Sequence, residues 1–450
     1  TTNISINKMK KYIILLLLNL VYSEIFEGYT ILTNLGGAPN IDYKTRLINN
    51  DFELINIWDH PSAPYSIGYL SPDSILTIGY KAINSEGEPP KIVKLNWDGE
   101  VLWQAFIPED FLQPHHDIEP LDNGNILLLG WETKSIEETT QAGKIDATDV
   151  FKPDKIVEIR PIDNNDYEII WEWHAWDHLI QDINPDLDNY GIISDNPQLA
   201  DINLVEIGPG SGDWMHTNAI SYNSYLDQIM ISVRHLCELW IIDHSTTTEE
   251  AASHSGGNSG LGGDIIYRWG NPSNYNRGAE SDRILDAPHG TVWIPNSYPS
   301  TGNILIFNNR HNPGDSAVLE INPDFDQDSN SYTIEENLPY GPDEPSWIYQ
   351  NDFYSLNQSG AFRLPNGNTI ITVVTGDRIF EIDESGLLVW EYYYTDGGFI
   401  PRAMKYGMDY FSNSLIGDIN QDSVIDVLDI IYVVNFIMGT TIPTLDQELR

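Results

Sequence analysis

Leu121-Asp-Asn-Gly-Asn-Ile-Leu-Leu-Leu129 is the stretch from which the fold can be worked out. It joins a polar Asn-Gly turn, which tolerates the positive φ of tight hairpins, to an apolar run of strand length. The same arrangement recurs as Thr301-Gly-Asn-Ile-Leu-Ile-Phe307 and as Leu364-Pro-Asn-Gly-Asn-Thr-Ile-Ile371. A turn and strand repeated at distant points of the chain indicate a repeated structural unit.

Each copy of this unit continues into further strands. Arg378–Asp383 follows the third copy and leads, through a second turn, to a strand that ends in Trp390-Glu391. Similar endings occur at Trp103, Trp171 and Trp269. Strands and turns that repeat every 40 to 75 residues or so are typical of β-propellers. Five units are clear, and a sixth is expected over residues 45–77, so the predicted fold is an all-β, six-bladed β-propeller.

The composition restricts the partners of the chain. Its 450 residues contain 23 Lys and Arg against 67 Asp and Glu, which gives a net charge of −44. Such a surface repels nucleic acid and anionic lipid, so no nucleic-acid partner is expected. An anionic ligand would need a locally positive pocket. The single cysteine, Cys237, excludes an intramolecular disulfide and is expected to pack in the core.

Three domains are expected. Residues 1–23 contain Met9-Lys-Lys11, a short apolar run and Ser23, the pattern of a secretory signal that is too short to span a bilayer. An exported protein, periplasmic, on the cell surface or extracellular, is therefore expected, with no integral membrane segment after signal removal. The propeller should occupy residues 29–410 and a small appendage residues 414–450. Within the propeller, residues 174–212 are a candidate lid and residues 246–263 a candidate mobile loop.

Three histidines occupy the same place in the repeat, directly ahead of a predicted strand. They are His116, His216 and His289. Equivalent positions in different blades face the central axis of a propeller, so the three imidazoles should meet in one cavity. His115 is adjacent to the first of them and is a further candidate for contact with substrate.

An anion-binding group belongs to the same region. Arg234 ends the apolar strand that begins at Gln228, and an arginine there is costly unless it meets an anion such as a tetrahedral oxyanion. Asn218 lies two residues after His216 and points to the same side of an extended chain. Two other interpretations stay open: a propeller enzyme with histidine-ligated zinc or iron, and a non-catalytic propeller that binds glycans or proteins. Arg234 argues against the metal.

Several motifs in the same order resemble those of the bacterial aryl-sulfate sulfotransferases. They lie within residues 60–395 and comprise His116–Asn125, His216–Ile220, Ser232–Arg234, Tyr267–Pro272 and Pro288–Gly290. The resemblance implies a sulfotransferase that is independent of the nucleotide donor PAPS and needs no cofactor for catalysis. A phenolic sulfate ester would be the donor and a phenol the acceptor.

The resemblance also implies residue roles. His289 would be the nucleophile that is transiently sulfurylated, and His116, His216, Asn218 and Arg234 would hold the anion. Either His116 or His216 would protonate the leaving phenolate and later deprotonate the acceptor.

The C-terminal segment carries a separate motif. Six residues occupy positions 1, 3, 5, 7, 9 and 12 of an EF-hand-type loop: Asp418, Asn420, Asp422, Val424, Asp426 and Asp429. Ser423 replaces the usual turn glycine, and an apolar stretch of helical pattern follows the loop. The segment resembles one half of a dockerin type I module, which implies bound Ca²⁺ and a cohesin or surface-anchoring partner.

Overall fold

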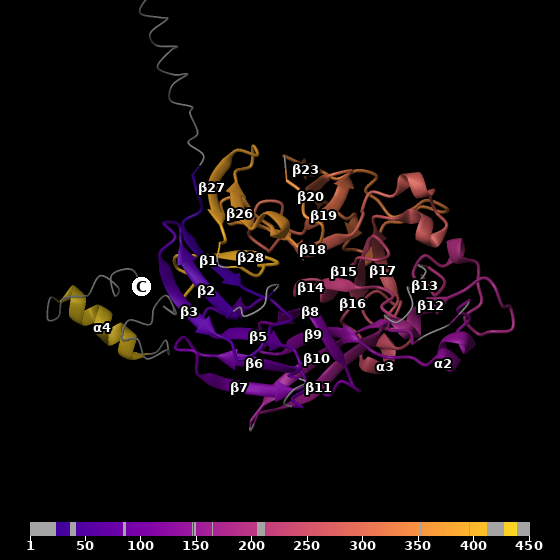
Figure 1. Ribbon diagram of the computed structural model, residues 1–450, viewed down its shortest axis with the longest axis horizontal. Coiled ribbons are helices and arrows are strands. Elements are labelled where there is room, and N and C mark those ends of the chain that lie inside the picture. Colours follow the sequence, from indigo (N-terminus) through magenta and orange to yellow (C-terminus); the bar gives the residue numbers. More distant parts are fainter. Residues whose placement is uncertain are drawn as a thin grey trace, which may run out of the picture.

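The protein is a ring of six four-stranded antiparallel sheets, as the sequence predicts (Figure 1). The computed structural model describes residues 24–36, 42–83, 87–145, 147, 150–163, 165–204, 212–351, 353–395, 397–411 and 427–438. The expected signal segment therefore lies outside the described residues, as does all of the expected calcium loop before residue 427. None of the described helices is long and apolar enough to cross a membrane.

The sheets are numbered here as blades in chain order, each written from its inner to its outer strand. Blade 1 is β28 (Ala403–Gly407), β1 (Gly28–Thr33), β2 (Lys44–Asn49) and β3 (Leu54–Asp59). Blade 2 is β4 (Tyr69–Leu70), β5 (Leu76–Tyr80), β6 (Lys91–Leu95) and β7 (Val101–Phe106). Blade 3 is β8 (Gln113–Pro120), β9 (Ile126–Trp131), β10 (Asp154–Ile162) and β11 (Asp166–His174).

The second half of the ring follows the same plan. Blade 4 is β14 (Thr217–Asn223), β15 (Gln228–Val233), β16 (Glu238–Asp243) and β17 (Ile265–Trp269). Blade 5 is β18 (Pro288–Trp293), β19 (Ile304–Asn312), β20 (Asp315–Ile321) and β23 (Trp347–Tyr349). Blade 6 is β24 (Gly360–Arg363), β25 (Thr369–Val373), β26 (Arg378–Ile382) and β27 (Leu388–Tyr393).

Short elements lie in the connections between blades and between the strands of one blade, and α4 follows the last strand. The two-stranded sheets are β12 (Leu179–Ile180) with β13 (Ala200–Asp201), and β21 (Phe325–Asp326) with β22 (Ser331–Tyr332). Among the described residues, the helices are α2 (Ile136–Gln141), α3 (Thr248–Ala251) and α4 (Val427–Ile437), and the 3₁₀ helices are η1 (Ala175–His178), η2 (Ile193–Asp195), η3 (Pro272–Tyr275), η4 (Glu280–Asp282) and η5 (Val374–Gly376).

The first blade is made from both ends of the propeller. Its inner strand β28 pairs antiparallel with β1, so that Thr30 lies opposite Lys405. This pairing closes the ring and leaves no open edge between the first and last parts of the domain. The sixth unit expected over residues 45–77 is divided, because β2 and β3 belong to blade 1 whereas β4 and the start of β5 belong to blade 2.

The repeat turns lie between the first and second strands of a blade. Gly124 and Gly367 have φ of +87° and +90°, which explains the glycine after asparagine in these turns. Each blade therefore has one strand more than the three counted in the sequence repeat. The added strand is the innermost one, and it precedes the turn.

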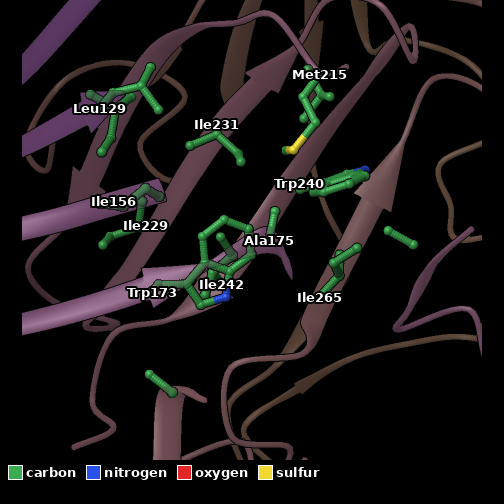
Figure 2. Packing of buried hydrophobic residues seen from close by; sticks show 14 of the residues in the cluster. Leu129, Ile156, Trp173, Ala175, Met215, Ile229, Ile231, Trp240, Ile242 and Ile265 are labelled. Atoms are coloured by element: carbon green, nitrogen blue, oxygen red, sulfur yellow. The ribbon is translucent and has the colours of Figure 1, made fainter. Parts of the chain in front are cut away.

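Apolar side chains fill the six seams between neighbouring blades. Each of the six core clusters draws its residues from two adjacent blades. Figure 2 shows the seam of blades 3 and 4, where Leu129 and Ile156 face Ile229 and Ile231. Because no blade buries both of its faces alone, each blade depends on its two neighbours for its core.

Candidate active site

The inner strands all run in the same direction, and their N-terminal ends meet around one cavity of about 350 Å³. Every blade contributes to its lining, which includes His115, His116, Asn218 and His289. His216 and Arg234 do not line this cavity. They lie beside it, as described below. The candidate lid, in its described part, contributes no lining residue, so the expectation that residues 174–212 cover this site is wrong for these residues.

The backbone at the N-terminal ends of the inner strands is unusual. His116 and His216 have φ of +61° and +51°, and Ala287, two residues before His289, has φ of +55°. In blades 3, 4 and 5 the pairing of the first two strands also shifts register near these residues. Bulges and left-handed residues re-aim side chains, and they commonly lie beside functional sites.

His289 is held with one nitrogen fixed as a donor. Its Nδ1 lies 2.6 Å from Asn309 Oδ1 and 3.1 Å from the Ala287 carbonyl oxygen. Asn309 cannot turn its amide, because its Nδ2 donates to the carbonyl oxygens of Ser355 and Gln358. Nδ1 must therefore carry the hydrogen, and the lone pair of the neutral ring resides on Nε2.

The environment keeps this ring neutral. Burial lowers the pKa of His289 to about 3, and the positive charge of Arg234 acts in the same direction. A neutral imidazole with its lone pair on Nε2 is a competent nucleophile at neutral pH.

His216 has a carboxylate partner. Its Nδ1 donates to Asp213 Oδ2, and the other carboxylate oxygen accepts a hydrogen bond of 3.1 Å from Trp131 Nε1. The pKa of Asp213 is lowered, because the hydrogen bond and charge of His216 outweigh the opposing effect of burial. His235 stacks on the His216 ring with centroids 4.7 Å apart, although no sequence motif indicates that it lies at the site.

His116 and His115 form a chain to a second buried carboxylate. His115 Nε2 lies 3.0 Å from Asp154 Oδ1, and His115 Nδ1 lies 2.9 Å from His116 Nδ1. Because the carboxylate only accepts, His115 donates through Nε2 and accepts at Nδ1, so His116 donates through Nδ1. The lone pair of His116 again resides on Nε2. Burial and the neighbouring His115, His216 and His289 hold its pKa well below the usual value.

The structure brings the predicted residues into one neighbourhood. The rings of His116 and His216 are 4.7 Å apart, and Arg234 follows Val233, which pairs with Thr217, so it lies across from His216. Arg234 Nε is buried and has no hydrogen-bond partner among the described residues. Asn218 Nδ2 donates to the Pro288 carbonyl oxygen at 2.8 Å, which ties blade 4 to blade 5.

Of the lining residues that the sequence motifs did not indicate, four add a charge, a hydroxyl or an indole ring to the cavity. Lys81 adds a positive charge, Tyr65 presents a buried hydroxyl with no described partner, and Trp131 stacks on His115 at 4.0 Å. Arg402 pairs with Asp117 at 2.6 Å. Tyr65 and Arg402 precede inner strands, as His216 does, so an alignment of the repeats could have predicted that they line the cavity. Lys81 follows a second strand and gave no such signal.

A larger cavity, of about 930 Å³, lies at the other ends of the inner strands. The two cavities share a buried wall. Asp117 Oδ1 accepts from Tyr69 at 2.8 Å and pairs with Arg402, which lines the histidine cavity, whereas Tyr69 lines the larger one. The histidine site is thus a pocket open at one end.

The expected calcium ligands are not placed. Asp418, Asn420, Asp422, Val424 and Asp426 lie outside the described residues, and of Asp429 only the backbone is described, within α4.

Loosely similar solved structures cover most of the chain. A protein from Lactobacillus plantarum has 8% identity and a TM-score of 0.45, covering 84% of this chain and 99% of its own. A protein of unknown function from Bacteroides caccae has 12% identity and a TM-score of 0.44, with coverage of 84% and 98%. A virginiamycin B lyase from Staphylococcus aureus has 12% identity and a TM-score of 0.36, with coverage of 82% and 89%. These values carry no argument about function.

No match was found among curated proteins. The family model of the arylsulfotransferases (ASST), in contrast, matches residues 69–338, which is more than half of the chain. The matched range begins at the inner strand of blade 2 and contains every histidine of the cavity together with Arg234. The chain belongs to the arylsulfotransferase (ASST) family.

Proposed function

We propose that the protein is a PAPS-independent aryl-sulfate sulfotransferase that moves a sulfuryl group from a phenolic sulfate ester to a phenol through sulfurylated His289. One observation carries this proposal: His289 is a buried neutral imidazole, fixed by Asn309 with its lone pair on Nε2, beside the unpartnered guanidinium nitrogen of Arg234. A nucleophile next to an anion-binding group is what attack on a sulfate ester requires.

In the first half-reaction, His289 Nε2 attacks sulfur. The N–S bond forms, the bond from sulfur to the phenolic oxygen breaks, and its electron pair stays on that oxygen. His216, as an imidazolium stabilised by Asp213, protonates the departing phenolate. His116 suits this role less well, because its lowered pKa keeps it neutral.

In the second half-reaction, the proton path is reversed. His216 Nε2 takes the proton of the acceptor phenol, whose oxygen attacks sulfur. The S–N bond breaks, and its electron pair returns to His289. The enzyme then holds the same protons as at the start, so donor and acceptor react in a ping-pong sequence.

Cations and aromatic rings of the cavity suit an aryl sulfate. Arg234 and Lys81 supply positive charge to the equatorial oxygens, and Tyr65 supplies an unpartnered hydroxyl. Trp131 and Phe399, on the cavity wall, provide an apolar surface for the phenyl ring.

The test is intact mass spectrometry after brief exposure to 4-nitrophenyl sulfate without an acceptor. The parent should gain about 80 Da, one SO₃ group on a covalent nucleophile, and peptide mapping should place it on His289. His289→Ala should gain nothing, whereas His311→Ala, which removes a histidine outside the cavity, should behave as the parent. Turnover of the donor by His289→Ala at the parent's rate would refute the mechanism.

One observation favours a second candidate, a metal-dependent propeller enzyme. The ligand atoms of Asp213, His216 and His235 all lie within 4.8 Å of one another. Elemental analysis and chelation distinguish the two: full donor turnover after removal of metal supports the transferase, and its loss supports the metal enzyme. A chain that binds aryl sulfates without turning them over would be a non-catalytic module.

Export and calcium binding complete the proposal. The basic and apolar pattern of residues 9–23 supports export, and the spacing of Asp418 to Asp429 supports a Ca²⁺ site and a cohesin or surface partner. A calcium titration that finds no binding in the full chain would contradict the Ca²⁺ site and leave the proposed transferase and its export untouched.

A further inference from the structure

A second group of histidines lies where two long segments between strands meet. The first segment is the candidate lid, residues 174–212, and the second is the candidate mobile loop, residues 246–263. His178 ends η1 in the first segment, His254 lies in the second, and Asp264 immediately precedes β17. His178 and Asp264 are buried, whereas the side chain of His254 is 60% exposed. Residues 246–263, expected to be a mobile loop, contain helix α3 with a capping box formed by Thr247 and Glu250.

The hydrogen bonds of His178 reveal a shortage of donors. Its Nε2 lies 2.9 Å from the Ala251 carbonyl oxygen, and its Nδ1 lies 2.8 Å from Asp264 Oδ1. Both neighbours are acceptors, but a neutral imidazole carries only one hydrogen. If Nε2–H donates to the carbonyl, the lone pairs of Nδ1 and the carboxylate face each other, and a cation between them removes the conflict.

His254 completes the set of ligands. Its Nδ1 lies 2.7 Å from the same oxygen, Asp264 Oδ1, and the three ligand atoms are all within 4.8 Å of one another. We propose that His178, His254 and Asp264 bind a divalent transition-metal ion of the zinc class. Two imidazoles and a carboxylate are ligands that Zn²⁺ accepts at about 2.1 Å, and the exposed side of His254 leaves its fourth position to water.

His178 is oriented by contacts of the kind that metal-binding histidines usually make. Its second nitrogen is fixed by a backbone carbonyl, the usual partner of a ligating imidazole. The ring of Trp173 lies parallel to it, 5.7 Å away, and donates its Nε1–H to the Gly263 carbonyl oxygen at 2.7 Å. A Cβ on Gly263 would lie 2.0 Å from the Ala251 oxygen and 2.8 Å from His178 Nε2, so only glycine fits there.

The ion would fasten the two insertions to blade 4. η1 and the loop that contains His254 are joined by Asp264 to the start of β17, the outermost strand of that blade. Because the ion cross-links segments that are distant in sequence, its removal should loosen residues 246–263 before it affects the ring.

Cobalt titration of the chelator-treated full chain tests the proposal. Co²⁺ absorbs visible light when bound by imidazole and carboxylate, so its binding can be followed directly. The buffer contains Ca²⁺, so that the predicted C-terminal loop is occupied and does not take up Co²⁺. We expect one Co²⁺ per chain to be displaced by Zn²⁺ and to be bound at least about tenfold more weakly by His254→Ala and Asp264→Asn. Because His254 is exposed, its replacement should leave the thermal unfolding of the metal-free chain unchanged.

Two control variants show which group of residues gives the Co²⁺ absorption. His235→Ala removes a ligand from the other three-residue group, and His311→Ala removes a histidine outside both groups. Both variants should bind one Co²⁺ that Zn²⁺ displaces, as the parent does. In a second measurement, Zn²⁺ should slow proteolysis within residues 246–263 in the parent and in both control variants, but not in His254→Ala. Absence of metal binding by the parent, or its loss in His235→Ala instead of His254→Ala, would overturn the proposal.

Discussion

At the scale of single residues, the site depends on which nitrogen of each imidazole carries a hydrogen. Acceptors placed at Nδ1 of His289 and His116 leave the lone pairs of these neutral rings on Nε2, and the acceptor at Nδ1 of His216 leaves its Nε2 to exchange a proton with the phenol. The positive φ of His116 and His216 directs these side chains, and histidine tolerates the left-handed region better than most residues do. The chemistry is thus prepared by partners that need not touch the substrate.

Asn309→Ala should slow the sulfurylation of His289 by about 10- to 100-fold. The variant removes the nearer acceptor from Nδ1, so the ring can turn or move its hydrogen to Nε2, which abolishes the lone pair that attacks. The measurement is the single-turnover rate of mass gain with an aryl sulfate. The affinity for the donor should change little, because Asn309 does not line the cavity.

Asn308→Ala is the matched control. Asn308 is equally buried and also hydrogen-bonds the backbone, through Asp286 N at 2.8 Å and the Ile284 carbonyl oxygen at 3.0 Å, but it does not contact His289. Equal slowing by both variants would indicate general loosening of β19 and contradict the specific role of Asn309.

At the scale of elements, each seam between blades is fastened by an outer-strand tryptophan. In five of the seams the indole Nε1 donates to the next blade: Trp58 to Asn96, Trp103 to Asp166, Trp171 to Thr246, Trp269 to Pro342 and Trp390 to Asn50. At the sixth, the guanidinium of Arg363 lies over the ring of Trp347 at 5.2 Å. The recurring tryptophans near the strand ends are therefore inter-blade contacts.

The seam of blades 3 and 4 also contains an ionic bridge with a predictable pH dependence. His244 Nδ1 lies 2.7 Å from Asp227 and Nε2 lies 3.0 Å from Glu158. Burial alone would lower the pKa of His244, but the two carboxylates outweigh it and raise the pKa to about 9. His244→Gln should cost about 3 kcal/mol of unfolding free energy at pH 6. The loss should diminish as the pH rises from 6.5 through about 9, because the parent then loses its imidazolium.

His60 should show the opposite trend and serves as the comparison. Burial lowers its pKa to about 4, and the neutral ring bonds Thr45 and Tyr80 at 2.8 Å each. The folded state then binds fewer protons than the unfolded one between pH 4 and 6.5, so this contribution is present above pH 6.5 and lost on acidification. Chemical unfolding from pH 4 to 9 should show a loss in His60→Gln that grows between pH 4 and 6.5, and a loss in His244→Gln that shrinks between pH 6.5 and about 9. Losses that do not change with pH in these two ranges would contradict both assignments.

At the scale of the whole molecule, a net charge of −44 surrounds a pocket that carries Lys81 and the nearby Arg234. This contrast makes the site selective for anions that reach it, while the outer surface repels nucleic acid. The positive charge comes from two different blades, so it exists only when the ring is closed.

The sequence allowed the propeller and the three histidines to be predicted, because both follow from one repeat register. The partners of those histidines could not be predicted in the same way. Asn309 and Asp154 come from second and third strands, where no repeat motif marks them. The division of residues 45–77 was missed because blade 1 takes its inner strand from beyond residue 400, and local patterns carry no information on that pairing.

Closure of the ring offers the last test. Lys405 of β28 pairs with Glu381 of blade 6 at 2.7 Å, and both side chains are fully buried, so this ion pair joins blade 6 to blade 1, the blade in which the ring closes. Lys405→Met should cost about 3–5 kcal/mol, because it leaves a buried carboxylate without its cation. Lys405→Met combined with Glu381→Gln should recover much of that loss, since no charge then remains buried.

Urea unfolding measures these losses, and Arg160→Met is the comparison for an ion pair on the surface. Its partner is Glu168, and both side chains are about half exposed at 55% and 50%, so its loss should cost less than about 1 kcal/mol. If Lys405→Met were no more damaging than Arg160→Met, the pair between β28 and blade 6 would not stabilise the closed ring. A large loss that the double variant reverses would instead mean that this ion pair stabilises the seam between blades 6 and 1, and with it the cavity shared by all six inner strands.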